Sequence, residues 1–306
     1  MTSGQPAAAG RASRRSLLAG LFGQGIGPSL SPEMHEREGA RQGLRYTYKR
    51  VELRDDQLTE GTLRGLLEHA VTLGFDGLNV THPVKQAMAP LVDELSPEAA
   101  AIGAINTVVV EEGRTRGHNT DVTGFAAALR DQLSGAPLER VVLLGAGGAG
   151  AAVAHALTGA GAAELVVVDH DASRARELVG ALTRVAGDGA RIGSPDELPR
   201  LLGDAQGLVN ATPVGMAAHP GIPMPAELLR EELWVADIVY RPLLTDLVRA
   251  ATDRGCRVMT GAGMAVGQAA DSFELFTGRT ADRAAMSTDF DALVAAELTT
   301  DHRPPG

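Results

Sequence analysis

The chain has a single cysteine, few aromatic residues and no long apolar segment. Of its 306 residues only Cys256 is a cysteine, which excludes an internal disulfide and a metal site built from thiolates. No segment approaches the roughly 20 apolar residues that cross a membrane. No basic cluster interleaved with aromatic residues indicates a nucleic-acid surface. With a net charge of −10 and 44% hydrophobic residues, the composition is that of a globular protein of two domains that binds neither nucleic acid nor membrane.

The N-terminus carries a motif that resembles an export signal. Residues 13–18, Ser-Arg-Arg-Ser-Leu-Leu, match the start of a twin-arginine signal. Such a signal needs a sustained apolar stretch and a small-residue cleavage site, but here the apolar run breaks at Gly20 and reaches a glycine-rich segment, residues 24–28. These residues favour a first strand over 16–22 that enters a loop. We therefore expect a cytoplasmic protein with a disordered extension over residues 1–15.

Strand and helix patterns alternate along both halves of the chain. In the first half, strands are predicted over 17–22, 46–53 and 77–81, and a hairpin over 107–110 and 115–117. A new unit begins at about residue 122, and its apolar strands are predicted over 141–144, 165–168, 207–210 and 234–239. Wholly apolar strands are typical of a parallel sheet covered on both faces. The predicted class is therefore α/β, with a doubly wound second unit.

A glycine-rich element after the strand 141–144 is built to hold a dinucleotide. In Gly145-x-Gly147-x-x-Gly150 the first glycine permits a tight turn, the second lets a pyrophosphate approach the backbone, and the third lets helix and strand pack closely. The following helix offers free N–H groups to the phosphates. The expected phosphate-binding residues are Gly145, Ala146, Gly147, Gly148, Ala149 and Gly150. The alternative is a glycine-rich turn that only packs a helix against a strand.

An acidic residue indicates which dinucleotide to expect. Asp169 ends the next strand 19 residues after Gly150, at the spacing of the acid that binds the adenosine ribose. A carboxylate accepts hydrogen bonds from the two ribose hydroxyls but repels the 2′-phosphate of NADP. Arg174 lies close by in the sequence and offsets part of that repulsion. The sequence therefore favours NAD over NADP.

Six short motifs follow one another between residues 18 and 278. They are 29–32 (Ser-Leu-Ser-Pro), 79–85 (Asn-Val-Thr-His-Pro-Val-Lys), 103–107 (Gly-Ala-Ile-Asn-Thr), 119–121 (Asn-Thr-Asp), 210–213 (Asn-Ala-Thr-Pro) and 263–269 (Gly-Met-Ala-Val-Gly-Gln-Ala). By this set and its order the chain resembles the shikimate dehydrogenase family, and more closely its quinate/shikimate dehydrogenase branch.

The resemblance implies two domains with a cleft between them. Residues 16–121 plus 262–298 would form a substrate-binding catalytic domain, 122–261 a Rossmann-type NAD(P)-binding domain, and 299–306 a tail. Family members interconvert shikimate and 3-dehydroshikimate, and some oxidise quinate to 3-dehydroquinate. The expected substrate is thus a cyclohexanoid hydroxy acid, and the expected chemistry is hydride transfer without a metal.

Lys85 and Asp121 match the catalytic lysine of the family and its partner. A secondary alcohol loses hydride only as its proton leaves, so a base must reach that hydroxyl. In reduction an ammonium protonates and stabilises the developing alkoxide. Asp121 would orient Lys85 and bind a neighbouring hydroxyl, and the sequence leaves open which of the two carries the proton. Without the resemblance, Lys85 would be a surface lysine and Asp121 a helix N-cap.

Ser29 and Ser31 match the serine pair that binds the substrate carboxylate, since hydroxyl donors near a helix N-terminus favour an anion. Ser31 also has the sequence context of an N-cap for a helix that begins at Pro32. The histidine that usually precedes the first serine is Pro28 here. Quinate-using relatives carry threonine in place of the second serine, which makes quinate a less certain substrate.

Seven further residues receive roles from the resemblance. Thr81, Asn106 and Gln268 are expected to bind substrate hydroxyls, and Tyr240 to lie near the substrate. Gly261 is expected near the nicotinamide, and Asn210 and Thr212 are expected to line the dinucleotide cleft. Without the resemblance, these residues are polar groups at strand ends or on helix faces.

Other functions remain open at this stage. A dehydrogenase of an aminoshikimate-type intermediate in secondary metabolism would retain Lys85, Asp121 and the serine pair. A non-catalytic NAD-binding regulatory protein would have lost Lys85 or Asp121. An enzyme like methylenetetrahydrofolate dehydrogenase shares the architecture but lacks this set of hydroxyl-binding residues. The expected oligomeric state is a monomer or a homodimer.

Overall fold

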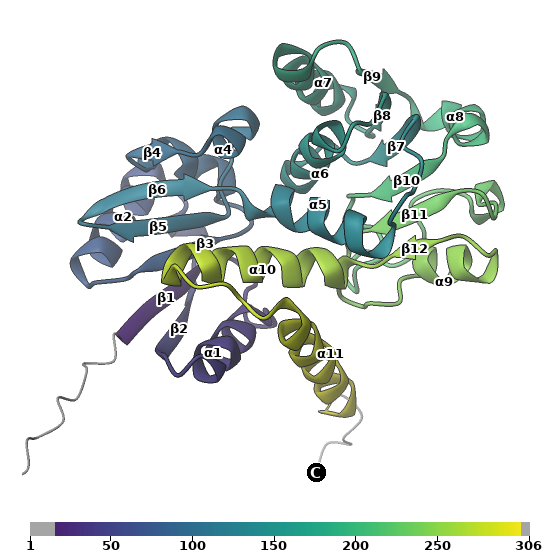
Figure 1. Cartoon of the computed structure of the whole chain (residues 1–306). Helices are drawn as coiled ribbons and strands as arrows, with labels where there is room; N and C mark the ends of the chain where they lie inside the picture. Colours follow the sequence, from purple (N-terminus) through teal and green to yellow (C-terminus); the bar gives the residue numbers. More distant parts are fainter. Residues whose placement is uncertain (1–15, 301–306) are drawn as a thin grey trace, which may run out of the picture.

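Two six-stranded sheets make up the computed structural model of the chain, which describes residues 16–300, with side chains described through residue 296 (Figure 1). The predicted disordered extension over residues 1–15 lies outside the described residues. Among residues 16–300, none of the helices is long and apolar enough to cross a bilayer.

The first sheet is built from residues 16–118 and has the order β2-β1-β3-β5-β6-β4. Its strands are β1 (Ser16–Gly23), β2 (Arg45–Glu52), β3 (Gly77–Val80), β4 (Glu94–Leu95), β5 (Thr107–Glu111) and β6 (Arg114–His118). β1 pairs in parallel with β2 and β3, whereas β5 and β6 form the predicted antiparallel hairpin. The carboxyl ends of the three parallel strands therefore meet at one edge of this sheet.

Helices cover both faces of the first sheet. They are α1 (Ser31–Arg41), α2 (Glu60–Thr72), α3 (Lys85–Met88) and α4 (Pro97–Ile102), with the short turns η1 (Asp55–Gln57) and η2 (Ala89–Leu91). Leu63 and Leu67 of α2 and Met88 of α3 pack on Leu78 and Val80 of β3. The opposite face is covered by α1 and α10 (Gly261–Thr277), and α11 (Arg283–Thr300) packs on these two helices.

The second sheet is wholly parallel and has the order β12-β11-β10-β7-β8-β9. Its strands are β7 (Arg140–Leu144), β8 (Glu164–Val168), β9 (Ala190–Gly193), β10 (Gly207–Asn210), β11 (Trp234–Asp237) and β12 (Val258–Met259). Its helices are α6 (Gly148–Gly159), α7 (Ala172–Ala186), α8 (Leu198–Asp204) and α9 (Asp246–Asp253), with the turns η3 (Pro195–Glu197) and η4 (Ala226–Leu228).

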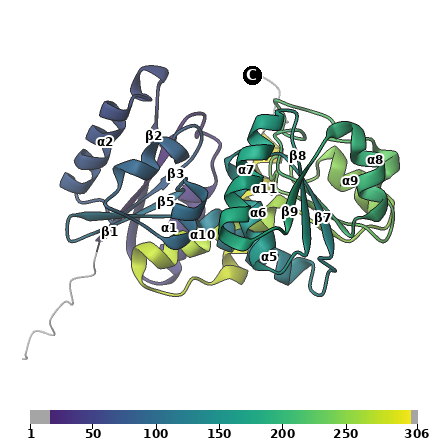
Figure 2. The ribbon, with the colours of Figure 1, turned by 90° about the horizontal axis from the view of Figure 1, so that it is seen from above.

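Alternate residues of the same strands fill two separate cores. Val141 and Leu143 of β7 pack against the helices α6 and α7, whereas Val142 and Leu144 pack against α8 and α9. Figure 2 shows α6 and α7 on one side of this sheet and α8 and α9 on the other. Burial on both faces is the reason why these strands lack any polar alternation. The predicted α/β class with a doubly wound second sheet is confirmed.

Two helices, α5 (Thr120–Gln132) and α10, lie side by side between the sheets (Figure 1). They touch through glycine: a Cβ on Gly267 would lie 2.8 Å from the Cα of Gly124, and a Cβ on Gly124 would lie 2.7 Å from the backbone N of Gln268. The predicted domain limits, residues 121 and 261, fall in these shared helices and stay a prediction.

Some local predictions were wrong. Ser31 is the first residue of α1, and the N-cap position belongs to Leu30, whose side chain makes no capping hydrogen bond. β11 ends at Asp237 rather than at residue 239. α11 continues to Thr300, two residues into the predicted tail 299–306. Residues 301–306 lie outside the described part of the chain.

We predict that Gly267→Ala lowers the free energy of unfolding by about 1–3 kcal/mol, because the added methyl group meets the backbone of α5 and the two helices must separate. The matched control is Gly65→Ala in α2, where a Cβ meets no atom within 4 Å. There the substitution should leave stability unchanged or raise it by up to about 1 kcal/mol. Urea denaturation measures both, and equal midpoints for the two variants would contradict the prediction.

Candidate active site

Asp121 lies in the first turn of α5 with its side chain only 5% exposed. Asn119 occupies the N-cap position, and its Oδ1 accepts a hydrogen bond from the backbone N of Asp121. Asp121 is therefore not a helix cap, and its carboxylate is free for other partners. Lys85, in the first turn of α3, places Nζ 2.6 Å from Oδ2 of Asp121. The structure thus brings together the two residues predicted as an acid–base pair.

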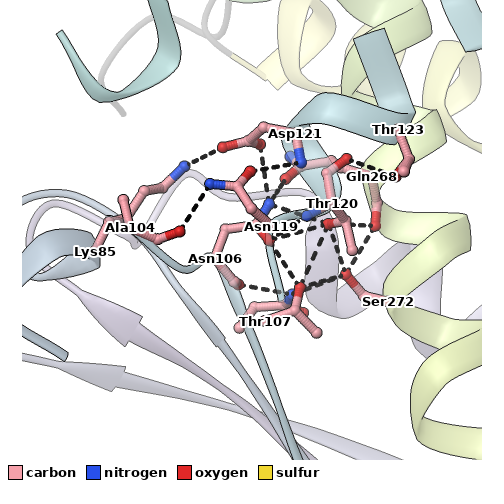
Figure 3. A network of polar contacts seen from close by, with 11 residues as sticks. Lys85, Ala104, Asn106, Thr107, Asn119, Thr120, Asp121, Thr123, Gln268 and Ser272 are labelled. Atoms are coloured by element: carbon pink, nitrogen blue, oxygen red, sulfur yellow. Dashed lines mark hydrogen bonds and ion pairs between the residues drawn. The ribbon is translucent and has the colours of Figure 1, made fainter. Parts of the chain in front are cut away.

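The second carboxylate oxygen of Asp121 is paired by Asn106. The Nδ2 of Asn106 donates to Oδ1 of Asp121 at 3.0 Å and to Oε1 of Gln268 at 3.2 Å. The orientation of this amide follows from its other end, because Oδ1 of Asn106 accepts a hydrogen bond from the backbone N of Thr120 at 2.7 Å. Figure 3 shows these contacts between Asn106, which precedes β5, Thr120 and Asp121 of α5, and Gln268 of α10. Both oxygens of the buried carboxylate therefore have donors, as a buried charge requires.

Three hydroxyl groups that were not predicted as site residues form a hydrogen-bonded cluster next to Asn106. Thr107, Thr120 and Ser272 lie within hydrogen-bonding distance of one another, and Thr107 Oγ1 donates to Oδ1 of Asn106 (Figure 3). Thr107 and Thr120 stand next to predicted residues inside the quoted motifs. Ser272 follows Gln268 by four residues, the spacing of neighbours on one helix face. That spacing was the signal that could have found it.

A cavity of about 560 Å³ opens between the two sheets beside this network. The predicted residues that line it are Ser29, Ser31, Thr81, Lys85, Asn106, Asp121, Gly147, Gly148, Ala149, Thr212, Tyr240, Gly261 and Gln268. Lining residues that were not predicted include Asn79, Met216, Arg241, Met264 and Ser272. The cavity therefore joins the predicted substrate residues to the middle of the glycine-rich loop.

The glycine-rich loop has the geometry of a phosphate-binding turn. Gly145 has a φ of +98°, in the region that favours glycine, and a Cβ on Gly150 would lie 2.1 Å from the carbonyl oxygen of Gly145. Gly147, by contrast, has no atom within 4 Å of a Cβ position and borders the cavity. The loop therefore offers room for a phosphate at Gly147 and the N-terminus of α6 directly behind it.

Asp169 and Arg174 lie outside the cavity, together with Gly145, Ala146 and Gly150. Asp169 accepts hydrogen bonds from the backbone N of Ala146 at 2.7 Å and of Asp171 at 2.8 Å. Asp171 in turn caps α7 through the backbone N of Ser173. The carboxylate of Asp169 thus holds the glycine-rich loop, a role that the sequence analysis did not foresee.

Asn210 does not reach the cavity that it was expected to line, since it is fully buried. Its Oδ1 accepts from the backbone N of Thr212, and its Nδ2 donates to Val214 O and to Asp237 Oδ1. Burial raises the pKa of the Asp237 carboxyl, although this carboxyl also accepts from Thr245. Asn210 therefore shapes the loop that presents Thr212 to the cavity.

Ser29 and Ser31 lie at the start of α1, where Ser31 N donates to Ser29 Oγ at 3.3 Å. Within residues 16–296, the hydroxyl of Ser31 makes no hydrogen bond, so it is available to a ligand in the cavity. Over the same residues no cluster of histidine, cysteine and acidic side chains could hold a metal ion.

His35 borders the cavity from α1 and is completely buried. Its Nδ1 lies 3.0 Å from the hydroxyl of Tyr46, while Nε2 has no hydrogen-bond partner in the described part of the chain. Burial lowers the pKa of His35 from 6.5 to about 3. The imidazole is therefore neutral at every pH at which the protein is expected to work.

The glycine-rich loop and the Lys85–Asp121 pair share one cavity in this fold, an arrangement suited to hydride transfer between a dinucleotide and an alcohol. This arrangement places the chain among the NAD(P)-dependent oxidoreductases.

Comparison with known proteins shows which family of oxidoreductases the chain resembles. A model of the shikimate dehydrogenase substrate binding domain matches residues 21–108, and one of the shikimate 5'-dehydrogenase C-terminal domain matches 261–287. The chain is 59% identical to a shikimate dehydrogenase (NADP(+)) of Streptomyces avermitilis, over 90% of this chain and 94% of that one. It is 44% identical to a quinate/shikimate dehydrogenase (NAD(+)) of Corynebacterium glutamicum, over 90% and 98%.

A solved structure agrees with these relatives. The quinate dehydrogenase from Corynebacterium glutamicum in complex with NAD superimposes with a TM-score of 0.86 at 43% identity, covering 90% of this chain and 99% of that one. The chain therefore belongs to the shikimate dehydrogenase family, and the family predicted from the six motifs is confirmed.

We predict that His35 makes the protein acid-sensitive. Its pKa is lowered in the folded state, so below pH 6.5 the unfolded chain binds a proton that the folded chain does not. The free energy of unfolding therefore decreases as the pH falls from 6.5 to about 3, by at most about 1.4 kcal/mol per pH unit. In His35→Gln this loss is absent. Urea denaturation between pH 7 and 4.5 should show a smaller decline for the variant than for the wild type. His69→Gln, which removes an exposed imidazole from α2, is the control and should decline as the wild type does.

Proposed function

We propose that this chain interconverts shikimate and 3-dehydroshikimate by direct hydride transfer, with Lys85 and Asp121 as its acid–base pair. The observation that carries the proposal is the 2.6 Å contact between Lys85 Nζ and Asp121 Oδ2 in a cavity that also reaches the glycine-rich loop. A relative named shikimate dehydrogenase (NADP(+)), at 59% identity, supports the choice of substrate.

The residues present fit a dinucleotide. The open space at Gly147 admits a pyrophosphate, the first backbone N–H groups of α6 can bind it, and Thr212 and Gly261 border the same cavity. When bound, the nicotinamide accepts or supplies the hydride. Gly261 and the substrate residues would border it, since they line the same cavity.

The substrate's polar groups match the polar side chains around the cavity. Ser29 and Ser31 bind the carboxylate beside the N-terminus of α1, whose N–H groups favour an anion. Thr81, Gln268 and Asn106 face the ring hydroxyls, and Tyr240 closes the cavity on the cofactor side. Each of these side chains lines the cavity, which supports the assignment.

Proton transfer is the task of the Lys85–Asp121 pair. During reduction the ammonium of Lys85 donates its proton to the oxygen that becomes the hydroxyl, and its positive charge stabilises the developing alkoxide. During oxidation the pair takes up the hydroxyl proton as one coupled unit. Asp121, whose carboxylate accepts from Asn106 and whose backbone N donates to Asn119, keeps the ammonium pointed at the ring. The chemistry therefore needs no metal.

NAD is the cofactor that we propose as preferred. At the adenosine end of the expected site, Asp169 and Asp171 bring two negative charges, and Arg174 lies 3.6 Å from Asp171. The guanidinium is thus paired within the cluster, which retains a net negative charge that repels a 2′-phosphate. Relatives of both kinds exist, since the Streptomyces one is named for NADP and the Corynebacterium one for NAD.

Several expectations stay predictions. Quinate and aminated ring acids remain alternative substrates, and a panel of shikimate, quinate and aminoshikimate with NAD⁺ and NADP⁺ separates them by nicotinamide absorbance. Turnover of none of them by a protein that binds the cofactor would favour the regulatory alternative. We propose that the protein is cytoplasmic and is a monomer or a homodimer.

We predict that Lys85→Ala lowers kcat for shikimate by about 10²–10⁴-fold, because the variant lacks the group that exchanges the proton. Its affinity for NAD⁺, measured by calorimetry, should equal that of the wild type. The chain has only one other lysine, Lys49, which is exposed on β2. Lys49→Ala is therefore the matched control and should keep wild-type turnover. Unchanged turnover in Lys85→Ala would refute the assigned pair.

We predict that Asp169→Ala raises the ratio of kcat/KM for NADP⁺ to that for NAD⁺ by about tenfold or more, since a carboxylate that repels the 2′-phosphate is removed. Asp188→Ala, which deletes an exposed acid of the same domain, is the control for net charge and should leave the ratio unchanged. A preference for NADP⁺ already present in the wild type would show that Arg174 overrides the carboxylates.

A further inference from the structure

The loop that carries Ser29 is held from outside the cavity by two charged side chains of β2. The carboxylate of Glu52 accepts hydrogen bonds from the backbone N of Gly25 and, at 3.1 Å, of Ile26. Nη2 of Arg50 donates to the carbonyl oxygen of Ser29 at 2.7 Å. Arg50 and Glu52 are two residues apart in one strand, so their side chains lie on the same face of the sheet. Opposite charges thus fix the two ends of the loop between β1 and α1.

Arg50 has a second partner at the start of α1. The same Nη2 lies 2.9 Å from Oε1 and 2.8 Å from Oε2 of Glu33. Glu33 follows Ser31 by two residues, so its carboxylate belongs to the same helical turn as the serine proposed to bind the substrate carboxylate. An unpaired Glu33 would repel that anion. Paired with Arg50, it brings no net charge to the site.

Neither Arg50 nor Glu33 lines the cavity, so both act through other residues. The Nε of Arg50 is buried, and within residues 16–296 it has no hydrogen-bond partner. A buried donor without a partner costs stability. The guanidinium thus leaves one donor unsatisfied while its Nη2 holds the Ser29 carbonyl and Glu33.

We propose that Arg50 is a positioning residue for the substrate carboxylate. It holds the Ser29 carbonyl so that the hydroxyls of Ser29 and Ser31 face the cavity, and it cancels the charge of Glu33 beside them. This inference rests on the proposed function, because it takes the serine pair as the carboxylate site.

The test compares R50M, R50K, E33Q and the double variant R50M/E33Q by steady-state kinetics with shikimate at saturating NAD⁺. R50M should raise KM for shikimate by about tenfold or more, because it leaves a charged group unpaired and a loop carbonyl unbound. KM for NAD⁺ and the urea midpoint should change little. R50K keeps the charge and should lie between R50M and the wild type. E33Q should not raise KM, and in the double variant it should recover part of the loss.

The control is R54M, which removes a neighbouring arginine whose ion pair with Asp56 is exposed at both ends. Its KM should be that of the wild type. A wild-type KM in R50M, in an enzyme that oxidises shikimate, would overturn the inference and leave the proposed function intact. A raised KM that E33Q does not relieve would also overturn it, because a purely structural role predicts that result. A wild-type chain inactive on every ring acid would instead overturn the proposed function, and the inference with it.

Discussion

The carboxylate of Asp121 is the group on which the organisation of the site depends. It is almost fully buried, and an ionised carboxylate leaves water only if both of its oxygens find donors. Those donors come from separate parts of the chain: Lys85 from the first turn of α3, and Asn106 from the residue before β5. The pair is therefore formed only where α3, the start of β5 and α5 are packed together.

The position of α5 is in turn set by its contact with α10. Backbone meets backbone at Gly124 and Gly267, which lets Gln268 reach Asn106 and Ser272 reach the hydroxyls of Thr107 and Thr120. These two helices also border the second sheet, so they connect the Lys85–Asp121 pair with the sheet that carries the glycine-rich loop. The same close packing that stabilises the chain thereby sets the distance between the Lys85–Asp121 pair and the glycine-rich loop.

The two loops that bind anions in this proposal are each held by charged groups that lie outside the cavity. Asp169 accepts from the backbone of the glycine-rich loop, and Arg50 and Glu52 hold the loop that carries Ser29. A loop hydroxyl or N–H can favour an anion only when its own direction is constrained, because a mobile donor loses the entropy of ordering on binding. The supporting charges thus contribute to recognition without touching the ligand.

Much of this could be predicted from local sequence. The strand before Gly145, the acid at Asp169 and the six motifs predicted the α/β class and the family, and they named most residues that line the cavity. The errors have local causes. Ser31 was taken for a cap because serine is a good one, but the helix begins one residue earlier. Asn210 was expected to line the cleft, whereas its side-chain amide is hydrogen-bonded to Thr212, Val214 and Asp237.

The sequence by itself determined the elements and the chemistry at their ends, because a glycine turn, an apolar strand or a helix start depends on neighbouring residues only. It could not determine which side chains meet. Lys85 and Asp121 are 36 residues apart in the sequence, and Asn106 and Gln268 are 162 apart. Arg50 contacts Ser29 from a strand that follows it by 21 residues. Such contacts follow from strand order and helix packing, which arise only when distant segments are buried together.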